Sequence, residues 1–289
     1  MNVGIGLPNA VPGASAELLV DWSRLADKGP FSSVGVLDRL NYPSHEPLET
    51  LSAAAAATTR IGLATTVVIG PLRDTALLAG TAASIDALSS GRLTLGLAIG
   101  ARKDDYEVAG VPTAGRGERL SRQLVELRAA WLQGKVEVAP ASPGGPPLLV
   151  GGTSDAAYAR VARHADGYVH GGGPARAFAR SRDRVLTAWE DFGRPGRPRF
   201  WAQGYFALGD DSVIAAGREY MLDYYAFTGP FAQRIAEGLL TTPQAVTQFV
   251  RAYEEAGCDE LVMFPAVADL SQVGALADIV GNGRLEEIA

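Results

Sequence analysis

The chain has 289 residues, a net charge of −6 and a pI of about 5.2, with 47% hydrophobic and 20% charged residues. This composition is typical of a folded globular enzyme and excludes a disordered chain. An acidic surface repels nucleic acid and anionic membranes, so we expect neither as a partner. Cys258 is the only cysteine, which excludes an internal disulfide and favours a cytoplasmic location.

The N-terminal half of the sequence disfavours a secreted protein and a membrane-spanning protein. The segment Met1–Pro8 has no basic region and is broken by a proline, so we do not expect a signal peptide. The longest apolar stretch, Ile61–Leu72, is too short to span a bilayer.

Short β-rich runs alternate with longer helical patterns along the chain. In the first half the predicted strands are Val3–Leu7, Val34–Asp38, Ile61–Ile69 and Arg92–Ile99, and the predicted helices are Ala16–Lys28, Glu46–Thr58, Thr75–Leu88 and Glu118–Leu132. In the second half the predicted strands are Leu148–Gly151, Gly167–His170, Phe200–Leu208 and Glu260–Phe264, with a longer helical region before the last one.

Alternating strands and helices force parallel pairing, because each helix must return the chain to the same end of the sheet. Eight such units in fewer than 300 residues predict one (β/α)₈ TIM barrel over residues 1–289. A Rossmann fold would need a Gly-x-Gly-x-x-Gly turn after a strand; Gly4-Ile5-Gly6 continues into Leu7-Pro8 instead. The Pro- and Gly-rich stretch Pro140–Pro147 is interpreted as a loop within this domain.

In such a barrel the reactive residues follow the C-terminal ends of the strands. Glycines and hydroxyls follow the fifth predicted strand at Gly151, Gly152 and Thr153, and three glycines follow the sixth at Gly171–Gly173. Glycines let backbone N–H groups approach a ligand, and a helix N-terminus favours an anion. Two such loops on consecutive strands predict a phosphate site, although each could also serve only as a tight turn with a helix cap.

Other candidates lie at the same end of the barrel. Asp38, Arg39 and Tyr42 follow the second strand, Thr65 and Thr66 interrupt the apolar third strand, and Gly100 follows the fourth. A buried hydroxyl needs a partner, so an inward-pointing threonine here is interpreted either as a ligand contact or as an ordinary strand residue. Asp38 is interpreted as a site residue or as a partner of Arg39.

The histidines are His45, His164 and His170, and no two have the spacing of metal ligands, so we expect no metal site. His170 ends a predicted strand and is a site candidate. A nucleophile elbow and a Cys–His pair are also absent from the sequence. The chemistry is therefore expected to come from an organic cofactor.

Several motifs together resemble the bacterial luciferase-like superfamily of flavin- and deazaflavin-dependent oxidoreductases. The resemblance covers nearly the whole chain and is carried by Glu46–Leu51 with Arg60–Leu63, Pro71–Arg73, Asp86–Leu93, Gly96–Gly110, Leu149–Gly152, Ala165–Tyr168, and Cys258–Leu261 with Phe264-Pro265. The superfamily fold is a (β/α)₈ barrel, in agreement with the pattern of strands.

The resemblance implies that Asp38 and Thr66 lie near an isoalloxazine-type ring. It also implies a non-prolyl cis peptide at Thr66-Val67, whose bulge backs the ring. The phosphate would lie against Gly151, Gly152, Thr153 and Gly171–Gly173. Tyr42, His170 or Tyr106 would supply a proton.

Three positions depart from family patterns. Arg39 stands where many members carry histidine, and Ile99 where the luciferase pattern has a phosphate-gripping arginine. Both favour coenzyme F420 with hydride transfer to an unsaturated substrate over the alternative, a two-component FMN monooxygenase supplied by a reductase. Ala101-Arg102 replaces a glutamate of the sugar-phosphate-oxidising branch. A non-catalytic flavin-binding protein is a remote third hypothesis.

The region between the last two strands carries aromatic residues at Tyr220, Tyr224, Tyr225, Phe227 and Phe231. These are interpreted as a core or subunit interface, or as a lid over the substrate pocket. We expect a homodimer that acts on a small molecule.

Overall fold

The computed structural model describes residues 1–286 and confirms the TIM barrel. Eight parallel strands close into a barrel in the order β1-β2-β3-β4-β5-β6-β7-β8, with β1 also pairing with β8. Their bounds are β1 Asn2–Gly6, β2 Ser33–Val36, β3 Gly62–Ile69, β4 Leu93–Ala98, β5 Leu148–Gly151, β6 Gly167–His170, β7 Arg199–Phe206 and β8 Glu260–Pro265.

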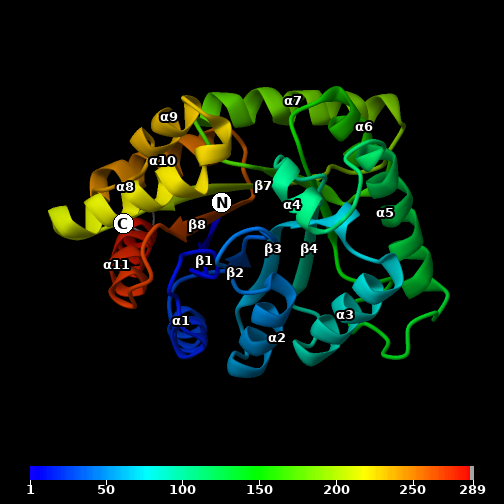
Figure 1. Cartoon of the computed structure of the whole chain (residues 1–289), viewed down its shortest axis with the longest axis horizontal. Coiled ribbons are helices and arrows are strands. Elements are labelled where there is room, and N and C mark those ends of the chain that lie inside the picture. Colours follow the sequence, from blue (N-terminus) through cyan, green and yellow to red (C-terminus); the bar gives the residue numbers. More distant parts are fainter. Residues whose placement is uncertain (287–289) are drawn as a thin grey trace.

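The helices form the outer layer around the strands (Figure 1). Their bounds are α1 Ala16–Lys28, α2 Pro47–Ala57, α3 Thr75–Leu88, α4 Lys103–Val108, α5 Arg116–Leu132, α6 Asp155–His164, α7 Ala175–Asp191, α8 Asp211–Tyr224, α9 Phe231–Glu237, α10 Pro243–Glu255 and α11 Ser271–Glu286, with short 3₁₀ turns η1 Gly70–Leu72 and η2 Ala226–Thr228. The predicted longer helical region before the last strand is therefore α8, η2, α9 and α10.

Local sequence explains where several helices begin. The side chains of Ser15, Asp74, Ser154 and Thr242 each accept a hydrogen bond from a backbone N–H of the following helix. Such caps satisfy amides that have no partner inside the helix. The predicted element ends differ from the observed ones by at most two residues. At α2 the difference arises because the cap Glu46 lies just outside the helix.

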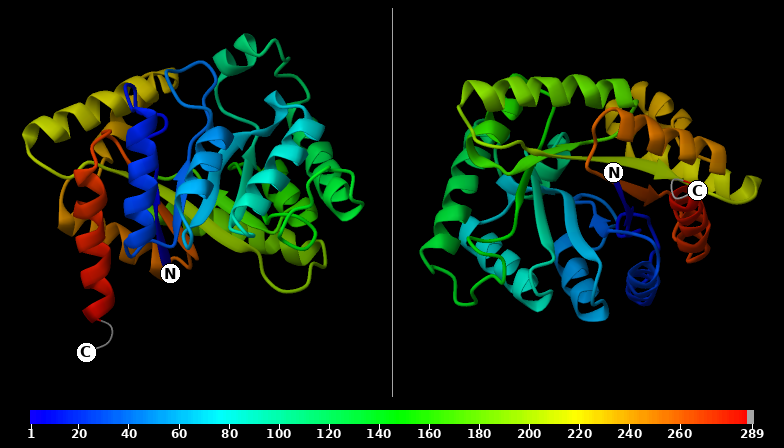
Figure 2. Two further views of the ribbon diagram at one scale, coloured as in Figure 1. Left: turned by 90° about the horizontal axis from the view of Figure 1, so that it is seen from below. Right: turned by 180° about the vertical axis from the view of Figure 1, so that it is seen from behind.

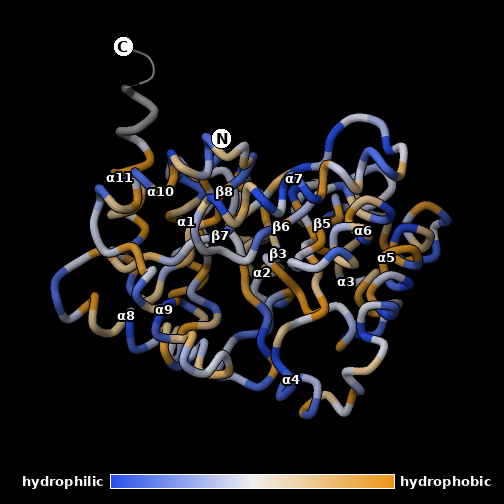
Figure 3. Tube along the Cα trace, turned by 90° about the horizontal axis from the view of Figure 1, so that it is seen from above, coloured by the Kyte–Doolittle hydropathy of each residue, from blue (hydrophilic) through white to orange (hydrophobic). Residues whose placement is uncertain are grey.

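The barrel interior is filled by side chains, and two glycines of β1 make room for them. A Cβ on Gly6 would lie 2.1 Å from Cδ1 of Phe264, and one on Gly4 would lie 2.2 Å from the Ser33 hydroxyl. The Gly4-Ile5-Gly6 sequence thus serves close packing inside the barrel and not a nucleotide turn. Hydrophobic segments run through the centre of the molecule (Figure 3).

The two ends of the barrel differ. The additional helices α4, α8 and α9 lie at the end opposite to the N-terminus (Figures 2 and 3). This is the end at which the parallel strands terminate, where barrel enzymes carry their active sites. In the part of the chain that the structure describes, no helix has the length and apolar character needed to cross a membrane.

Candidate active site

A cavity of about 450 Å³ opens at the C-terminal ends of the strands. It is bordered by the ends of β2 to β7, by the loops that follow them and by the segment after α8. Predicted site residues that line it are Asp38, Thr66, Val67, Gly100, Gly151, Gly152, Thr153 and Gly171. Arg39, Tyr42, Thr65, His170, Gly172 and Gly173 are not among the lining residues.

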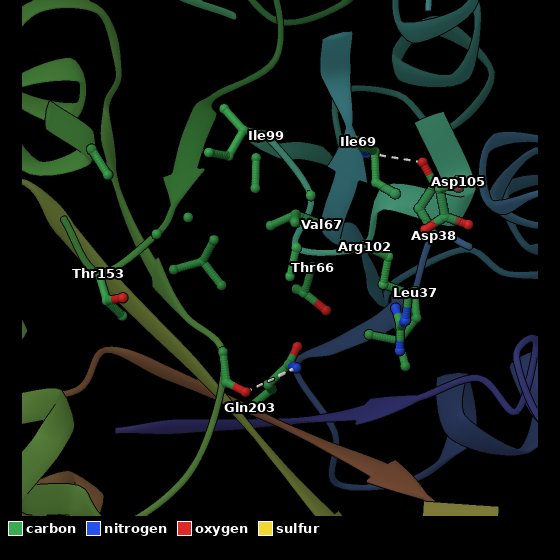
Figure 4. Close-up of a pocket in the computed structure, with 18 of the residues that line it drawn as sticks. Leu37, Asp38, Thr66, Val67, Ile69, Ile99, Arg102, Asp105, Thr153 and Gln203 are labelled. Carbon is green, nitrogen blue, oxygen red and sulfur yellow. Dashed lines mark hydrogen bonds between the residues drawn. The ribbon is translucent and has the colours of Figure 1, made fainter. Parts of the chain in front are cut away.

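The centre of the cavity is bordered by the predicted irregularity in β3. The Thr66-Val67 peptide is cis, and the register between β3 and β4 shifts between Thr65 and Val68. Thr66 and Val67 lie in the middle of the lining residues in Figure 4. The Thr66 hydroxyl and the Gln203 Oε1 are both buried without a hydrogen-bond partner among the described residues. Two unsatisfied polar atoms in one cavity indicate a polar ligand.

The adjacent Thr65 has a different role. Its hydroxyl accepts a hydrogen bond from the Gly96 N–H (2.8 Å) and donates one to the Gly96 carbonyl (2.7 Å). Thr65 therefore joins β3 to β4. Its contact with a cofactor stays a prediction.

The first glycine loop borders the cavity just before α6. Gly152 has a φ of +134°, in a region that side chains rarely adopt, and a Cβ there would lie 2.8 Å from the Ala157 Cβ. The Ser154 hydroxyl caps α6 by accepting from the Ala157 N–H, so the cap and a ligand loop coexist. Backbone exposed before a helix N-terminus suits an anion.

The second glycine loop contributes less to the lining. Gly171 borders the cavity and its carbonyl accepts from the Gln203 amide at 3.3 Å. Gly172 has a φ of +98°, and the Gly173 carbonyl accepts from the Tyr253 hydroxyl at 2.8 Å. This loop therefore bends away toward α10 after its first residue.

Two arginines that the sequence analysis did not identify border the same part of the cavity. Arg160 of α6 donates to the Ser121 hydroxyl and the Gly117 carbonyl, and Arg116 of α5 donates to the Gly100 carbonyl. Neither has a carboxylate within ion-pair distance among the described residues. They supply positive charge to the cavity that the glycine loop also lines. The sequence does contain a signal for Arg160, because this residue lies between the apolar residues Ala157 and Val161 on the buried face of α6.

Asp38 and Arg39 do not pair with each other. Asp38 accepts from the Ile69 N–H (2.9 Å) and pairs with Arg73 (3.1 Å). Burial raises the pKa of the Asp38 carboxyl above its usual range, although Arg73 and the Ile69 amide oppose the shift. Arg39 pairs instead with Asp104 at 3.2 Å and Asp105 at 3.9 Å.

Tyr42 and His170, both predicted proton donors, are held by other side chains. The Tyr42 hydroxyl donates to Asp223 at 2.6 Å, and burial together with that bond raises its pKa. His170 shares a hydrogen bond of 3.0 Å with the Tyr168 hydroxyl. Burial lowers the pKa of His170 to about 4, against the effect of a bond to the Gly172 backbone, so its ring is neutral at pH 7.

Aromatic residues on β7 and after α8 form the remaining wall. Tyr205, Tyr224, Tyr225 and Phe227 all line the cavity. The Tyr225 hydroxyl donates to the Tyr205 hydroxyl at 2.8 Å. Burial, reinforced by neighbouring tyrosines, raises the pKa of Tyr205 well above its ordinary value. Both hydroxyls therefore stay protonated near neutral pH. The aromatic residues after α8 thus form one wall of the cavity.

Arg102 lies within this aromatic wall. Its guanidinium carbon lies 4.4 Å from the centroid of the Tyr224 ring and 4.2 Å from that of Phe227. It donates to the Tyr224 carbonyl at 2.7 Å. In Figure 4, Arg102 and Thr153 lie on opposite sides of Thr66 and Val67.

Comparisons with known proteins show the family to which the chain belongs. A family model described as luciferase-like monooxygenase matches residues 1–238. An uncharacterised protein of Mycobacterium tuberculosis is 35% identical over 165 residues, which are 53% of this chain and 57% of that protein. The oxygenase component of the flavin-dependent trigonelline monooxygenase of Acinetobacter baylyi is 29% identical over 118 residues, or 39% of this chain and 33% of that protein. The match thus spans about half the length of the first relative and a third of the second.

A solved structure shows the same fold at lower identity. The F420-dependent secondary alcohol dehydrogenase in complex with an F420-acetone adduct superposes with a TM-score of 0.79 and 15% identity, covering 96% of this chain and 97% of that one. Enzymes of this fold therefore include F420-dependent and flavin-dependent oxidoreductases. Because the family model matches residues 1–238, which is most of the chain, the chain belongs to the luciferase-like monooxygenase family.

Proposed function

We propose that the protein is an oxidoreductase that binds coenzyme F420 and passes a hydride to a small unsaturated organic substrate. The proposal rests mainly on one observation: the Tyr205–Tyr225 hydroxyl pair borders the same cavity as Thr66 and the Gly151–Thr153 loop. A protonated hydroxyl would thus share one cavity with the proposed site for a phosphorylated ring compound.

The residues of the cavity fit a deazaflavin. The unpartnered Thr66 hydroxyl and Gln203 Oε1 suit the polar edge of a tricyclic ring. Gly151, Gly152 and Thr153 would hold the phosphate, with Arg116 and Arg160 supplying charge. Asp38 also borders the cavity and would lie beside the ring.

When bound and reduced, the deazaflavin supplies a hydride to an electron-poor double bond. Tyr205 would donate the accompanying proton, because its hydroxyl borders the cavity and stays protonated at neutral pH. Tyr224, Tyr225 and Phe227 would keep water from the reacting atoms. Arg39, Tyr42 and His170 remain proposed site residues that act from beside the cavity.

A flavin-dependent monooxygenase is the second proposal. It is favoured by the family description and by the similarity to the trigonelline monooxygenase, a flavin-dependent oxygenase component. In that case a separate reductase would supply reduced FMN. The F420 proposal is preferred because Arg39 and Ile99 replace two residues of the oxygen-activating pattern. We also propose a homodimer, which light scattering on the purified protein tests.

Expression in a host that makes both cofactors tests the proposal. The purified protein should carry the absorbance band of the deazaflavin, and the Thr66→Val variant should carry less of it. A flavin band in its place supports the monooxygenase, and loading with neither cofactor would contradict both proposals.

A further inference from the structure

Arg102 is a buried cation that has no carboxylate within ion-pair distance among the described residues. Its relative exposure is 8%, and its Nε has no hydrogen-bond partner among the described residues. Arg102 donates a hydrogen bond to a neutral acceptor, the Tyr224 carbonyl. A buried guanidinium without an anion is unfavourable, so a role beyond packing is indicated.

Two carboxylates, Asp38 and Asp105, line the same cavity as Arg102 and have other partners, although the Asp105 Oδ2 is itself buried without a hydrogen bond. Asp38 pairs with Arg73 and accepts from the Ile69 N–H. Asp105 accepts from the backbone N–H groups of residues 40 and 41 and lies 3.9 Å from the Arg39 guanidinium. Within the described part of the chain, no carboxylate lies within ion-pair distance of Arg102.

The surroundings of Arg102 limit what its partner can be. Tyr224 and Phe227 stack against the guanidinium and hold its plane. A guanidinium fixed in this way matches the two oxygens of a carboxylate. The adjoining wall is aromatic, with Tyr205 and Tyr225, and suits a planar organic group.

Arg102 is also separated from the phosphate loop. Thr153 lies on the other side of Thr66 and Val67 in Figure 4, and two further arginines, Arg116 and Arg160, also line the cavity. A cofactor phosphate held by Thr153 is therefore not the anion that Arg102 receives.

We propose that Arg102 is the receptor for a carboxylate group of the substrate, and that the substrate is a small planar unsaturated carboxylic acid. This proposal rests on the proposed function, which places the cofactor ring at Thr66 and the proton donor at Tyr205. It adds the chemical class of the substrate and the residue that selects it.

Binding of two carboxylates and their neutral amides tests the proposal. Calorimetry would compare cinnamate with cinnamamide, and benzoate with benzamide, on the wild-type protein, Arg102→Gln and Arg102→Lys. We expect at least one acid to bind ten or more times more tightly than its amide in the wild type, about 1.4 kcal/mol. Arg102→Gln should reduce that ratio to near one while amide binding persists, and Arg102→Lys should restore part of it.

The amide serves as the control for folding, because a collapsed pocket would lose both ligands. Equal binding of acid and amide by the wild type, or a preference that survives in Arg102→Gln, would overturn the proposal. Repeating the titrations with F420-saturated and FMN-saturated protein identifies the source of the anion. A preference abolished by F420 alone would assign Arg102 to a carboxylate of that cofactor and overturn the substrate assignment.

Failure of the proposed function gives a different result. If neither cofactor binds but the acids remain preferred through Arg102, the carboxylate receptor stands and the F420 proposal fails.

Discussion

The hydroxyl of Tyr225 donates a hydrogen bond of 2.8 Å to the hydroxyl of Tyr205, and both rings border the same cavity. One tyrosine comes from β7 and the other from the turn after α8. The bond therefore joins the barrel to the segment that covers its mouth.

Replacement of either tyrosine by phenylalanine tests this pair. Tyr205→Phe removes the proposed donor and should lower turnover roughly a hundredfold or more, the size of a general-acid effect. Tyr225→Phe removes only the supporting bond and should cost less. Cofactor affinity, measured by fluorescence titration, should stay unchanged in both. Normal turnover in Tyr205→Phe would remove this residue from the mechanism.

The neighbouring residues Thr65 and Thr66 provide a matched pair of variants. Thr66→Val removes a buried hydroxyl without a partner, so the cofactor-free protein should keep or raise its melting temperature while cofactor affinity falls. Thr65→Val removes two hydrogen bonds to Gly96 and should lower the free energy of unfolding by about 1–3 kcal/mol. Thermal melts and cofactor titrations check both. The opposite pattern would show that Thr65 faces the ligand.

The fold was predictable because its signals are periodic and local. Apolar strands such as β3 are buried on both faces, and caps such as Asp74 mark where helices begin. The glycine loops could be located because they follow strand ends in sequence. Contacts between distant segments could not be predicted from the sequence. Arg39, for example, pairs with Asp104, 65 residues away, and not with the adjacent Asp38.

The aromatic residues between β7 and β8 show the same limit of prediction from sequence. Its composition was visible, but two interpretations remained open because a stripe of tyrosines suits either an interface or a pocket. In the structure Tyr224, Tyr225 and Phe227 line the cavity, whereas Tyr220 is buried in a hydrophobic cluster and Phe231 is exposed. Arg160 was missed because an arginine on a helix is usually solvated, whereas here it lies under α5.

A phosphate-free ligand distinguishes binding of the phosphate from binding of the ring. A Cβ on Gly151 would meet its neighbours at 3.5 Å or more, so Gly151→Val should fold while crowding the loop. Arg160→Gln should remove charge there. Each should weaken cofactor binding at least tenfold, about 1.4 kcal/mol, but leave the affinity for the phosphate-free ring-and-ribityl fragment unchanged. Equal losses for cofactor and fragment would contradict the assignment.

Stability should fall as the pH decreases from about 6.5 toward 4 because of His170. Its pKa is lowered to about 4 by burial, while the unfolded chain titrates near 6.5. The unfolded state therefore binds the proton first, so the stabilisation present above pH 6.5 is lost on acidification, up to about 3 kcal/mol. His170→Gln should flatten this part of the denaturation profile. An unchanged profile would contradict the burial effect, and a loss of turnover at constant stability would support the predicted catalytic role.

The central claim is that this barrel holds coenzyme F420 between Thr66 and the Gly151–Thr153 loop. Equilibrium titration of the cofactor-free protein with F420 and with FMN, followed by quenching of tryptophan fluorescence, tests it most directly. F420 should bind at least tenfold more tightly than FMN, and Thr66→Val should weaken the F420 complex. Tighter binding of FMN, or F420 affinity that Thr66→Val leaves unchanged, would contradict it.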